Sequence, residues 1–337
     1  MSDDRTPIDP PRVPGGEAAG DGASDVAGRL RIGLNLPTWP VAGGRNATWA
    51  EMRALALEAE ALGIDTLWAP DHLQRRVPDR PVIGFWECWT IVTATAAVTS
   101  TIEVGPFVAC TGFRNPGLLA RMATTLDEVS GGRVILGLGS GVPATDESWR
   151  AFGYDGASHV SRHAESVEAI SRLLREGRLT YEGSFVRMDG AEVVPSGPRP
   201  GGPPIWVAAK GDRTLGIAAR FADAVNVNMA LTGPAEAAAQ VDRVADACRA
   251  AGRDPATLAV TGWARLALRP DGSAVPRPGW IGGAPAEVAT TLREIRGAGI
   301  AHLTLYPSPD DDPSPLPALT RDGLGRLRPV LEALDAR

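Results

Sequence analysis

The residues best suited to chemistry in this chain are Asp71 and His72, which follow a short apolar segment, residues 66–69, after a single proline. Histidine changes its charge near neutral pH, so its imidazole can donate or accept a proton during a reaction. An adjacent aspartate can fix the tautomer of an imidazole or accept a hydrogen bond from a ligand N–H. His72 is therefore a candidate general acid or base, although a histidine that only caps the next segment would occupy the same position.

Two turns have the composition of phosphate-binding loops: Gly139-Ser140-Gly141 and Lys210-Gly211-Asp212-Arg213-Thr214. The glycines of the first turn let backbone N–H groups approach a ligand, because no side chain is in the way. The second turn offers two cations and the start of a helix, where free N–H groups favour an anion. Each turn alone is a weak signal, but together, on neighbouring strands of the predicted fold, they indicate an anion site.

Other motifs that would indicate a metal site, an esterase or a glycosidase are missing from the sequence. His159 and His163 share a helix face at i, i+4, but no third ligand is spaced nearby, and no metal site is predicted. The chain has no Gly-x-Ser-x-Gly motif and no close pair of carboxylates at strand ends, which argues against an esterase or a glycosidase. Four tryptophans could either wall a flat substrate or belong to the core: Trp39, Trp68, Trp86 and Trp89.

The elements that position these residues follow one repeating pattern, a short apolar strand, a polar turn and an amphipathic helix. Strands are predicted at 31–36, 66–69, 102–110, 134–138, 205–208, 224–227, 258–266 and 302–306. Helices are predicted at 48–62, 89–98, 116–130, 158–175, 213–221, 234–251, 284–298 and 319–334.

Eight parallel strands with intervening helices predict an α/β fold, the (β/α)8 or TIM barrel. Residues that follow the strands then converge at one end, and further candidates there are Asn228, Trp263, Arg265 and Tyr306. Insertion loops are expected at the C-terminal face of the strands, and three segments break the alternation: a hairpin at 179–188 and Pro- and Gly-rich stretches at 195–204 and 270–280. The alternative is an open doubly wound sheet, but no GxGxxG follows the first strand.

The bulk composition narrows the class of protein. The chain has 337 residues, 44% hydrophobic and 22% charged, which is typical of a soluble globular protein. A net charge of −6 gives no reason to expect nucleic acid or anionic membrane surfaces as partners. Three scattered cysteines favour a reducing, cytoplasmic location, and no apolar run is long enough to span a membrane. Residues 1–28 are predicted to be a disordered tail, and 29–337 the barrel domain.

From about Arg31 to Leu334 the chain resembles the bacterial luciferase-like superfamily of flavin- and deazaflavin-dependent oxidoreductases. Three segments and a helix entry support the resemblance: GIDTLWAPDH at 63–72, the stretch from FRNP at 113 to GSG at 141, PIWVAA to AD at 204–223, and GGAPAEV at 282–288. Their order and spacing match the barrel units predicted above.

The resemblance implies a barrel that binds FMN or coenzyme F420, usually as a homodimer, and acts on a small-molecule substrate. It assigns His72 as the catalytic residue and Asp71 as a cofactor contact. Cys110 lies where the third strand meets the flavin, and a non-prolyl cis peptide is expected near residues 107–110. The remaining matches are the loops that bind the cofactor tail and its phosphate: Ser140, Gly141, Lys210, Gly211, Arg213 and Thr214.

One position departs from the family pattern. Deazaflavin sugar-phosphate dehydrogenases of this superfamily have a glutamate directly after the Gly-x-Gly turn, where this chain has Val142. Their proton-relay partner is therefore missing, and sugar-phosphate oxidation is not expected. Glu87 is a candidate substitute.

The sequence thus predicts an oxidoreductase that performs hydride transfer or oxygen insertion with FMN or coenzyme F420. The turn at 113–116 leans slightly to F420, and the loops at 75–85 and 270–280 name no substrate. Two alternatives remain open. One is a non-catalytic flavin-binding barrel, and the other is a barrel lyase or aldolase for a phosphorylated substrate, with Lys210 as a Schiff-base candidate.

Overall fold

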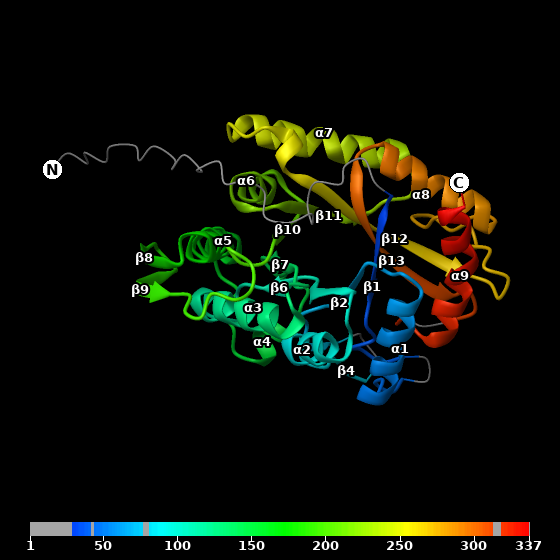
Figure 1. Ribbon diagram of the computed structural model, residues 1–337, viewed down its shortest axis with the longest axis horizontal. Helices are drawn as coiled ribbons and strands as arrows, with labels where there is room; N and C mark the ends of the chain where they lie inside the picture. Colours follow the sequence, from blue (N-terminus) through cyan, green and yellow to red (C-terminus); the bar gives the residue numbers. More distant parts are fainter. Residues whose placement is uncertain (1–28, 42–43, 77–80, 313–317, 337) are drawn as a thin grey trace.

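The computed structural model describes residues 29–41, 44–76, 81–312 and 318–336. The tail predicted at residues 1–28 lies outside the described residues. Within the described part, a parallel sheet forms the centre of the molecule and helices surround it (Figure 1).

The main sheet confirms the predicted parallel barrel. Its strand order is β5-β2-β1-β13-β12-β11-β10-β7-β6, and every neighbouring pair is parallel. The strands are β1 (Arg31–Asn35), β2 (Thr66–Ala69), β5 (Glu103–Pro106), β6 (Ala109–Cys110), β7 (Leu136–Gly139), β10 (Ile205–Ala209), β11 (Ala224–Ala230), β12 (Ala259–Leu268) and β13 (Ile300–Pro309).

The third barrel strand is interrupted, and its two parts are β5 and β6. The interruption is at the Phe107–Val108 peptide bond, which is cis, in the place where the resemblance led us to expect one. A bridge between Val104 of β5 and Val134, just before β7, joins the two ends of the sheet. Because β5 and β6 are two parts of one strand, the nine strand segments form the eight strands of a closed barrel.

The helices lie where the periodicity predicted them, to within a few residues. They are α1 (Trp49–Ala61), α2 (Cys88–Val98), α3 (Pro116–Ser130), α5 (His159–Glu176), α6 (Asp212–Phe221), α7 (Pro234–Ala250), α8 (Pro285–Gly297) and α9 (Arg321–Asp335). Helix α3 shows the local cause: the Asn115 side chain accepts from the first free N–H groups, Pro116 occupies the first turn, and Gly131 ends the helix at φ 67°. A short helix, α4 (Ser148–Ala151), and a 3-10 turn, η1 (Pro255–Thr257), were not predicted.

Two antiparallel hairpins are inserted in the barrel: β3 (Gln74–Arg75) with β4 (Ile83–Gly84), and β8 (Arg178–Glu182) with β9 (Arg187–Glu192). The second confirms the hairpin predicted at 179–188. Glu165 of α5 holds its turn by accepting the backbone N–H groups of residues 184–186. This hairpin therefore packs on the outside of the barrel, beside α5.

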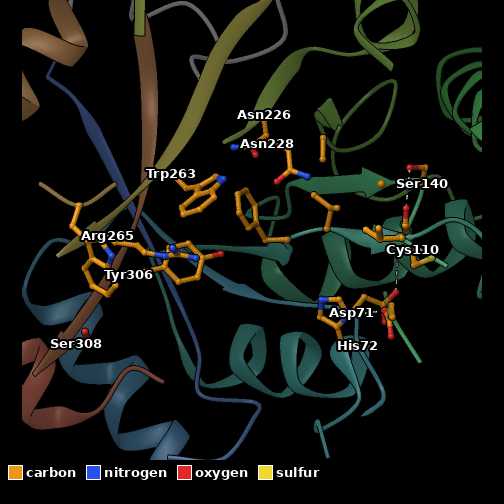
Figure 2. Close-up of a pocket in the computed structure, with 18 of the residues that line it drawn as sticks. Asp71, His72, Cys110, Ser140, Asn226, Asn228, Trp263, Arg265, Tyr306 and Ser308 are labelled. Carbon is orange, nitrogen blue, oxygen red and sulfur yellow. Dashed lines mark hydrogen bonds and ion pairs between the residues drawn. The ribbon is translucent and has the colours of Figure 1, made fainter. Parts of the chain in front are cut away.

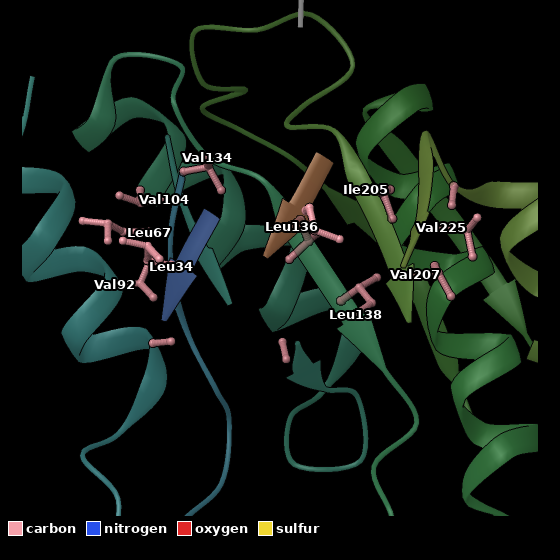
Figure 3. Packing of buried hydrophobic residues seen from close by; sticks show 14 of the residues in the cluster. Leu34, Leu67, Val92, Val104, Val134, Leu136, Leu138, Ile205, Val207 and Val225 are labelled. Atoms are coloured by element: carbon pink, nitrogen blue, oxygen red, sulfur yellow. The ribbon is translucent and has the colours of Figure 1, made fainter. Parts of the chain in front are cut away.

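The core consists of two layers separated by the strands. Apolar side chains that point outward from the strands pack under the helices, as Figure 3 shows for Leu34, Leu67 and Leu136. Inside the barrel, Trp68 and Trp206 pack with their ring centroids 5.2 Å apart and close its lower part. Trp68 is fully buried, so of the two alternatives left open for it by the sequence it belongs to the core.

Candidate active site

A cavity of about 460 Å³ opens at the carboxyl ends of the barrel strands, within the range of small-molecule sites. Figure 2 shows most of its lining. The lining residues are Asp71, His72, Phe107, Val108, Cys110, Gly139, Ser140, Gly141, Val142, Asp146, Ala208, Asn226, Asn228, Trp263, Arg265, Arg277, Trp280, Tyr306, Ser308 and Asp312.

His72 lies at this cavity and is paired with a carboxylate that the sequence did not single out. Its Nδ1 is 2.7 Å from Oδ2 of Asp146, which leaves Nε2 as the ring nitrogen available to a bound molecule. The His72 side chain is 47% exposed and that of Asp146 only 8%. Burial opposes ionisation of Asp146, but hydrogen bonds from His72 and Ser148 lower the pKa of its carboxyl below the usual value.

Asp146 is brought to His72 by the loop that leads into α4. The Ser148 hydroxyl oxygen accepts hydrogen bonds from the backbone N–H groups of Leu73 and Gln74, at 3.1 and 3.2 Å. The Ser148 N–H in turn donates to Oδ1 of Asp146, at 2.9 Å. These bonds join the loops after β2 and β7, so the histidine and its carboxylate are positioned by backbone contacts.

Glu87 does not replace the missing relay glutamate. Its side chain caps the start of α2 by accepting the Thr90 N–H, and it forms an ion pair with Arg114. The carboxylate that contacts His72 is Asp146 instead.

Asp71 is fixed by the protein although it lines the cavity. Its side chain has no exposed surface, and both carboxylate oxygens accept hydrogen bonds from Arg114. Oδ2 also accepts the backbone N–H of Cys110, at 2.9 Å. Burial opposes the charge on Arg114, but the bonds to Asp71 and Glu87 raise the pKa of its guanidinium. Asp71 therefore fixes the backbone of β6 directly after the cis peptide.

Cys110 and the glycine turn form the wall beside this carboxylate. Burial raises the pKa of the Cys110 thiol to about 12, so the sulfur stays neutral and is no nucleophile at ordinary pH. A Cβ on Gly139 would lie 2.4 Å from Val108, and one on Gly141, at φ 70°, would lie 2.8 Å from the Cys110 sulfur. Close packing against neighbouring side chains therefore explains both glycines.

The second predicted phosphate turn lies beside the cavity but does not line it. Lys210 is exposed, and its N–H and that of Gly211 each donate to Thr214 Oγ1 at 3.2 Å, at the start of α6. The Arg213 side chain donates to Ser161 at 2.6 Å. The structure thus brings Asp71, His72, Cys110, Ser140 and Gly141 to one cavity, and places Lys210, Gly211, Arg213 and Thr214 outside its lining.

The far side of the cavity is formed by residues that alternate along the last strands. Trp263 and Arg265 point inward from β12, and Tyr306 and Ser308 from β13. Burial raises the pKa of Tyr306 to about 12, although Asn35 and Arg265 act to lower it. The phenol therefore stays protonated at neutral pH and can donate a hydrogen bond.

Several lining residues were not predicted from the sequence: Asp146, Asn226, Ser308 and Asp312. Val108 lies in the segment 107–110 expected at the flavin, and Arg277 and Trp280 belong to the predicted insertion loop at 270–280. The period-2 alternation of β11 and β13 could have indicated Asn226 and Ser308, because each is two residues from a predicted strand-end residue. Of the tryptophans proposed as a substrate wall, Trp39 and Trp89 are buried and Trp86 is 46% exposed, and none of these three lines the cavity.

Comparison with known proteins agrees with this architecture. A family model described as luciferase-like monooxygenase matches residues 30–277, well over half of the chain. The 5,10-methylenetetrahydromethanopterin reductase of Methanolobus tindarius is 30% identical over 213 residues, which cover 63% of this chain and 60% of the reductase. The F420-dependent glucose-6-phosphate dehydrogenase of Kineococcus radiotolerans is 27% identical, covering 89% of this chain and 98% of that protein.

The chain spans less than two thirds of the length of the methanopterin reductase. Among solved structures, an F420-dependent secondary alcohol dehydrogenase in complex with an F420–acetone adduct has a TM-score of 0.72 at 17% identity. The match covers 91% of this chain and 99% of that one, and it supports the barrel fold.

Proposed function

The chain belongs to the luciferase-like monooxygenase family, and from this we propose that it is an oxidoreductase that uses FMN or coenzyme F420. The observation that carries the proposal is the His72–Asp146 pair at a cavity that also contains the Phe107–Val108 segment. A poised proton donor next to such a cavity suits reactions in which hydride and proton move to or from a substrate.

The residues of the cavity are compatible with a flat ring that has one polar edge. Phe107, Val108 and Ala208 offer neutral, largely apolar surface, whereas Asn226 and Asn228 add amide groups that can bind carbonyl and N–H atoms. We expect the cofactor tail at Ser140 and Gly141 and its phosphate near the start of α6, at Lys210, Gly211, Arg213 and Thr214. When bound, the cofactor supplies hydride transfer or, as reduced FMN, oxygen activation.

The contribution of the protein is to hold a proton at a defined atom. Because the pKa of Asp146 is lowered, its carboxylate is ionised at neutral pH and accepts the Nδ1–H of His72. The imidazole is thereby held in the tautomer whose Nε2 can accept a proton from a substrate hydroxyl, or return it to a carbonyl oxygen.

The substrate is a small molecule, and we do not expect it to be a sugar phosphate. Val142, which takes the place of the glutamate of sugar-phosphate dehydrogenases, lines the cavity and is 52% exposed. Asp146 instead provides a carboxylate for His72 from four residues further along the chain.

We expect a homodimer in a reducing, cytoplasmic environment, where the three free cysteines stay reduced. None of the described helices is long and apolar enough to cross a membrane. Light scattering after size exclusion measures the oligomeric state directly, and a monomer at micromolar concentration would contradict the dimer.

The proposed function is tested by titrating the purified chain with FMN and with coenzyme F420, followed by absorbance and fluorescence. Tight binding of F420 alone would identify a hydride-transfer enzyme, and tight binding of FMN with oxygen consumption a monooxygenase. If neither cofactor bound, the proposal would be wrong. Borohydride trapping of a substrate on Lys210 would then support the lyase, although this lysine is exposed and outside the cavity lining.

A further inference from the structure

The side of the cavity away from His72 combines two arginines with two tryptophans, and the proton transfer described above does not use them. Trp263 and Arg265 come from β12, and Arg277 and Trp280 from the loop that follows it. Figure 2 shows Trp263 and Arg265 on the opposite side of the cavity from His72. These four residues are called the Arg–Trp wall below.

The guanidinium groups of the wall lie over its indole rings. Cζ of Arg265 is 5.0 Å from the ring centroid of Trp263 and 5.6 Å from that of Trp280. Cζ of Arg277 is 5.3 Å from the Trp280 centroid. Such stacking uses the face of the guanidinium and leaves the N–H groups at its edge available to oxygen atoms.

Arg265 has no ion-pair partner among the described residues. Its side chain is exposed, and among residues 29–41, 44–76, 81–312 and 318–336 its guanidinium has no hydrogen-bond or ion-pair partner. Arg277 donates to the backbone carbonyl of Asp310, at 2.8 Å. Asp312 also lines the cavity, so the lining adds one carboxylate to these two cations.

We propose that the Arg–Trp wall binds the substrate through an oxyanion, a carboxylate or a phosphate, attached to a flat apolar body. The planar edge of Arg265 matches two oxygens of such a group, and the indoles of Trp263 and Trp280 cover the body. The identification of this molecule as the substrate rests on the proposed function, whereas the anion site itself does not.

The other possible source of an oxyanion is the tail of the cofactor. The turns expected to bind that tail follow β7 and β10, and β11 separates β10 from β12 in the sheet. Ser140 and Cys110 lie on the side of the cavity opposite Arg265 and Tyr306 in Figure 2. This separation favours the substrate as the carrier of the anion.

The test measures binding of benzoate and of neutral benzamide to the full chain by ligand-observed NMR, with and without saturating FMN or F420. We expect benzoate to bind at least about tenfold more tightly than benzamide, and Arg265→Gln to remove that preference. The affinity for the cofactor and the melting temperature should not change. Arg178→Gln is the matched control, because it removes the same charge from a side chain 72% exposed on the outer hairpin.

Equal binding of benzoate and benzamide by the unmodified chain, or undiminished benzoate binding by Arg265→Gln, would overturn the anion site. Loss of cofactor affinity in Arg265→Gln would assign the anion to the cofactor instead. Tighter binding of glucose 6-phosphate than of benzoate would contradict the apolar body, and Trp280→Ala should weaken benzoate binding. Benzoate binding without binding of either cofactor would refute the proposed function and leave the anion site standing.

Discussion

At the scale of single residues, the role proposed for His72 in proton transfer depends on Asp146. The hydrogen bond from Nδ1 to this buried carboxylate selects one tautomer and fixes the orientation of the ring. Ser148 holds the carboxylate from its other oxygen, so the pair has a fixed orientation before any ligand arrives.

We expect His72→Ala to lower kcat by about 10²–10⁴-fold, the usual contribution of a general acid or base. Asp146→Asn should lower kcat by a smaller factor with little change in KM, because the asparagine amide can donate to Nδ1 and so hold the imidazole in the other tautomer. Steady-state kinetics between pH 5 and 9 measure both effects. Asp155→Asn, at an exposed aspartate outside the cavity lining, is the control, and an unchanged kcat in Asp146→Asn would contradict its positioning role.

A second residue-scale prediction concerns His163, which is buried in α5 and lies 3.0 Å from Thr111 Oγ1 through Nδ1. Burial, and to a smaller extent His159, lowers the pKa of His163 to about 4. Because this is below the unfolded value of about 6.5, its stabilisation is complete above that pH and is lost as the pH falls toward 4, at most by about 3 kcal/mol.

Urea denaturation between pH 7 and pH 4 measures this loss. His163→Asn keeps an N–H donor for Thr111 and removes the titration, so its stability should fall less over the same range. The same slope in both proteins would show that His163 is not responsible.

At the scale of elements, the interruption between β5 and β6 places Phe107 and Val108 in the lining of the cavity. Val108 fills the space beside Gly139, where a Cβ would be 2.4 Å from its side chain. Gly139→Ala should displace this segment and weaken cofactor binding by about tenfold or more, since overpacking costs about 1–3 kcal/mol. Fluorescence titration measures the affinity.

Gly216→Ala is the matched control for Gly139→Ala, because a Cβ there meets nothing within 4 Å and the residue lies inside α6. It should leave the cofactor affinity unchanged and stabilise the chain slightly. Equal cofactor affinity in both variants would mean that the segment at Val108 does not support the cofactor.

The barrel strands and the long helices were predictable, because apolar periodicity and local caps determine them, whereas α4 and η1 are too short to show an apolar period. The hairpin at 179–188 and Pro116 at the first turn of α3 are local signals of this kind. Asp146 was not predictable, since it meets His72 only through loops that are 74 residues apart in sequence. The neighbours of Lys210 likewise depend on how α6 is placed, which a turn composition does not specify.

At the scale of the whole molecule, the buried ion pair of Asp127 and Arg199 joins helix α3 to the segments that lead into β7 and β10. Asp127 of α3 has a side chain 1% exposed and is paired with Arg199, which lies before β10 and also donates to the Val134 carbonyl, at 2.6 Å. We expect Arg199→Ala to lower the free energy of unfolding by about 3 kcal/mol, because the buried Asp127 would lose its cationic partner and keep only the long hydrogen bond from the Val134 N–H, at 3.4 Å.

Urea denaturation measures this change, and Arg187→Ala is the control. Arg187 is paired with Glu182, but both side chains are more than three quarters exposed, so its loss should change stability by less than about 1 kcal/mol. Equal effects of the two substitutions would contradict a special role for Arg199.

The packing of Trp68 and Trp206 inside the barrel has a consequence for the kinetics of binding. Trp68 and Trp206 lie earlier on their strands than the lining residues Asp71 and Ala208, so among the described residues they fill the barrel interior on the side away from the loops that follow the strands. If cofactor and substrate both enter the cavity from the side of these loops, the one that binds deeper must bind first and dissociate last. The kinetic mechanism should therefore be ordered, and product-inhibition patterns would show whether cofactor or substrate binds first.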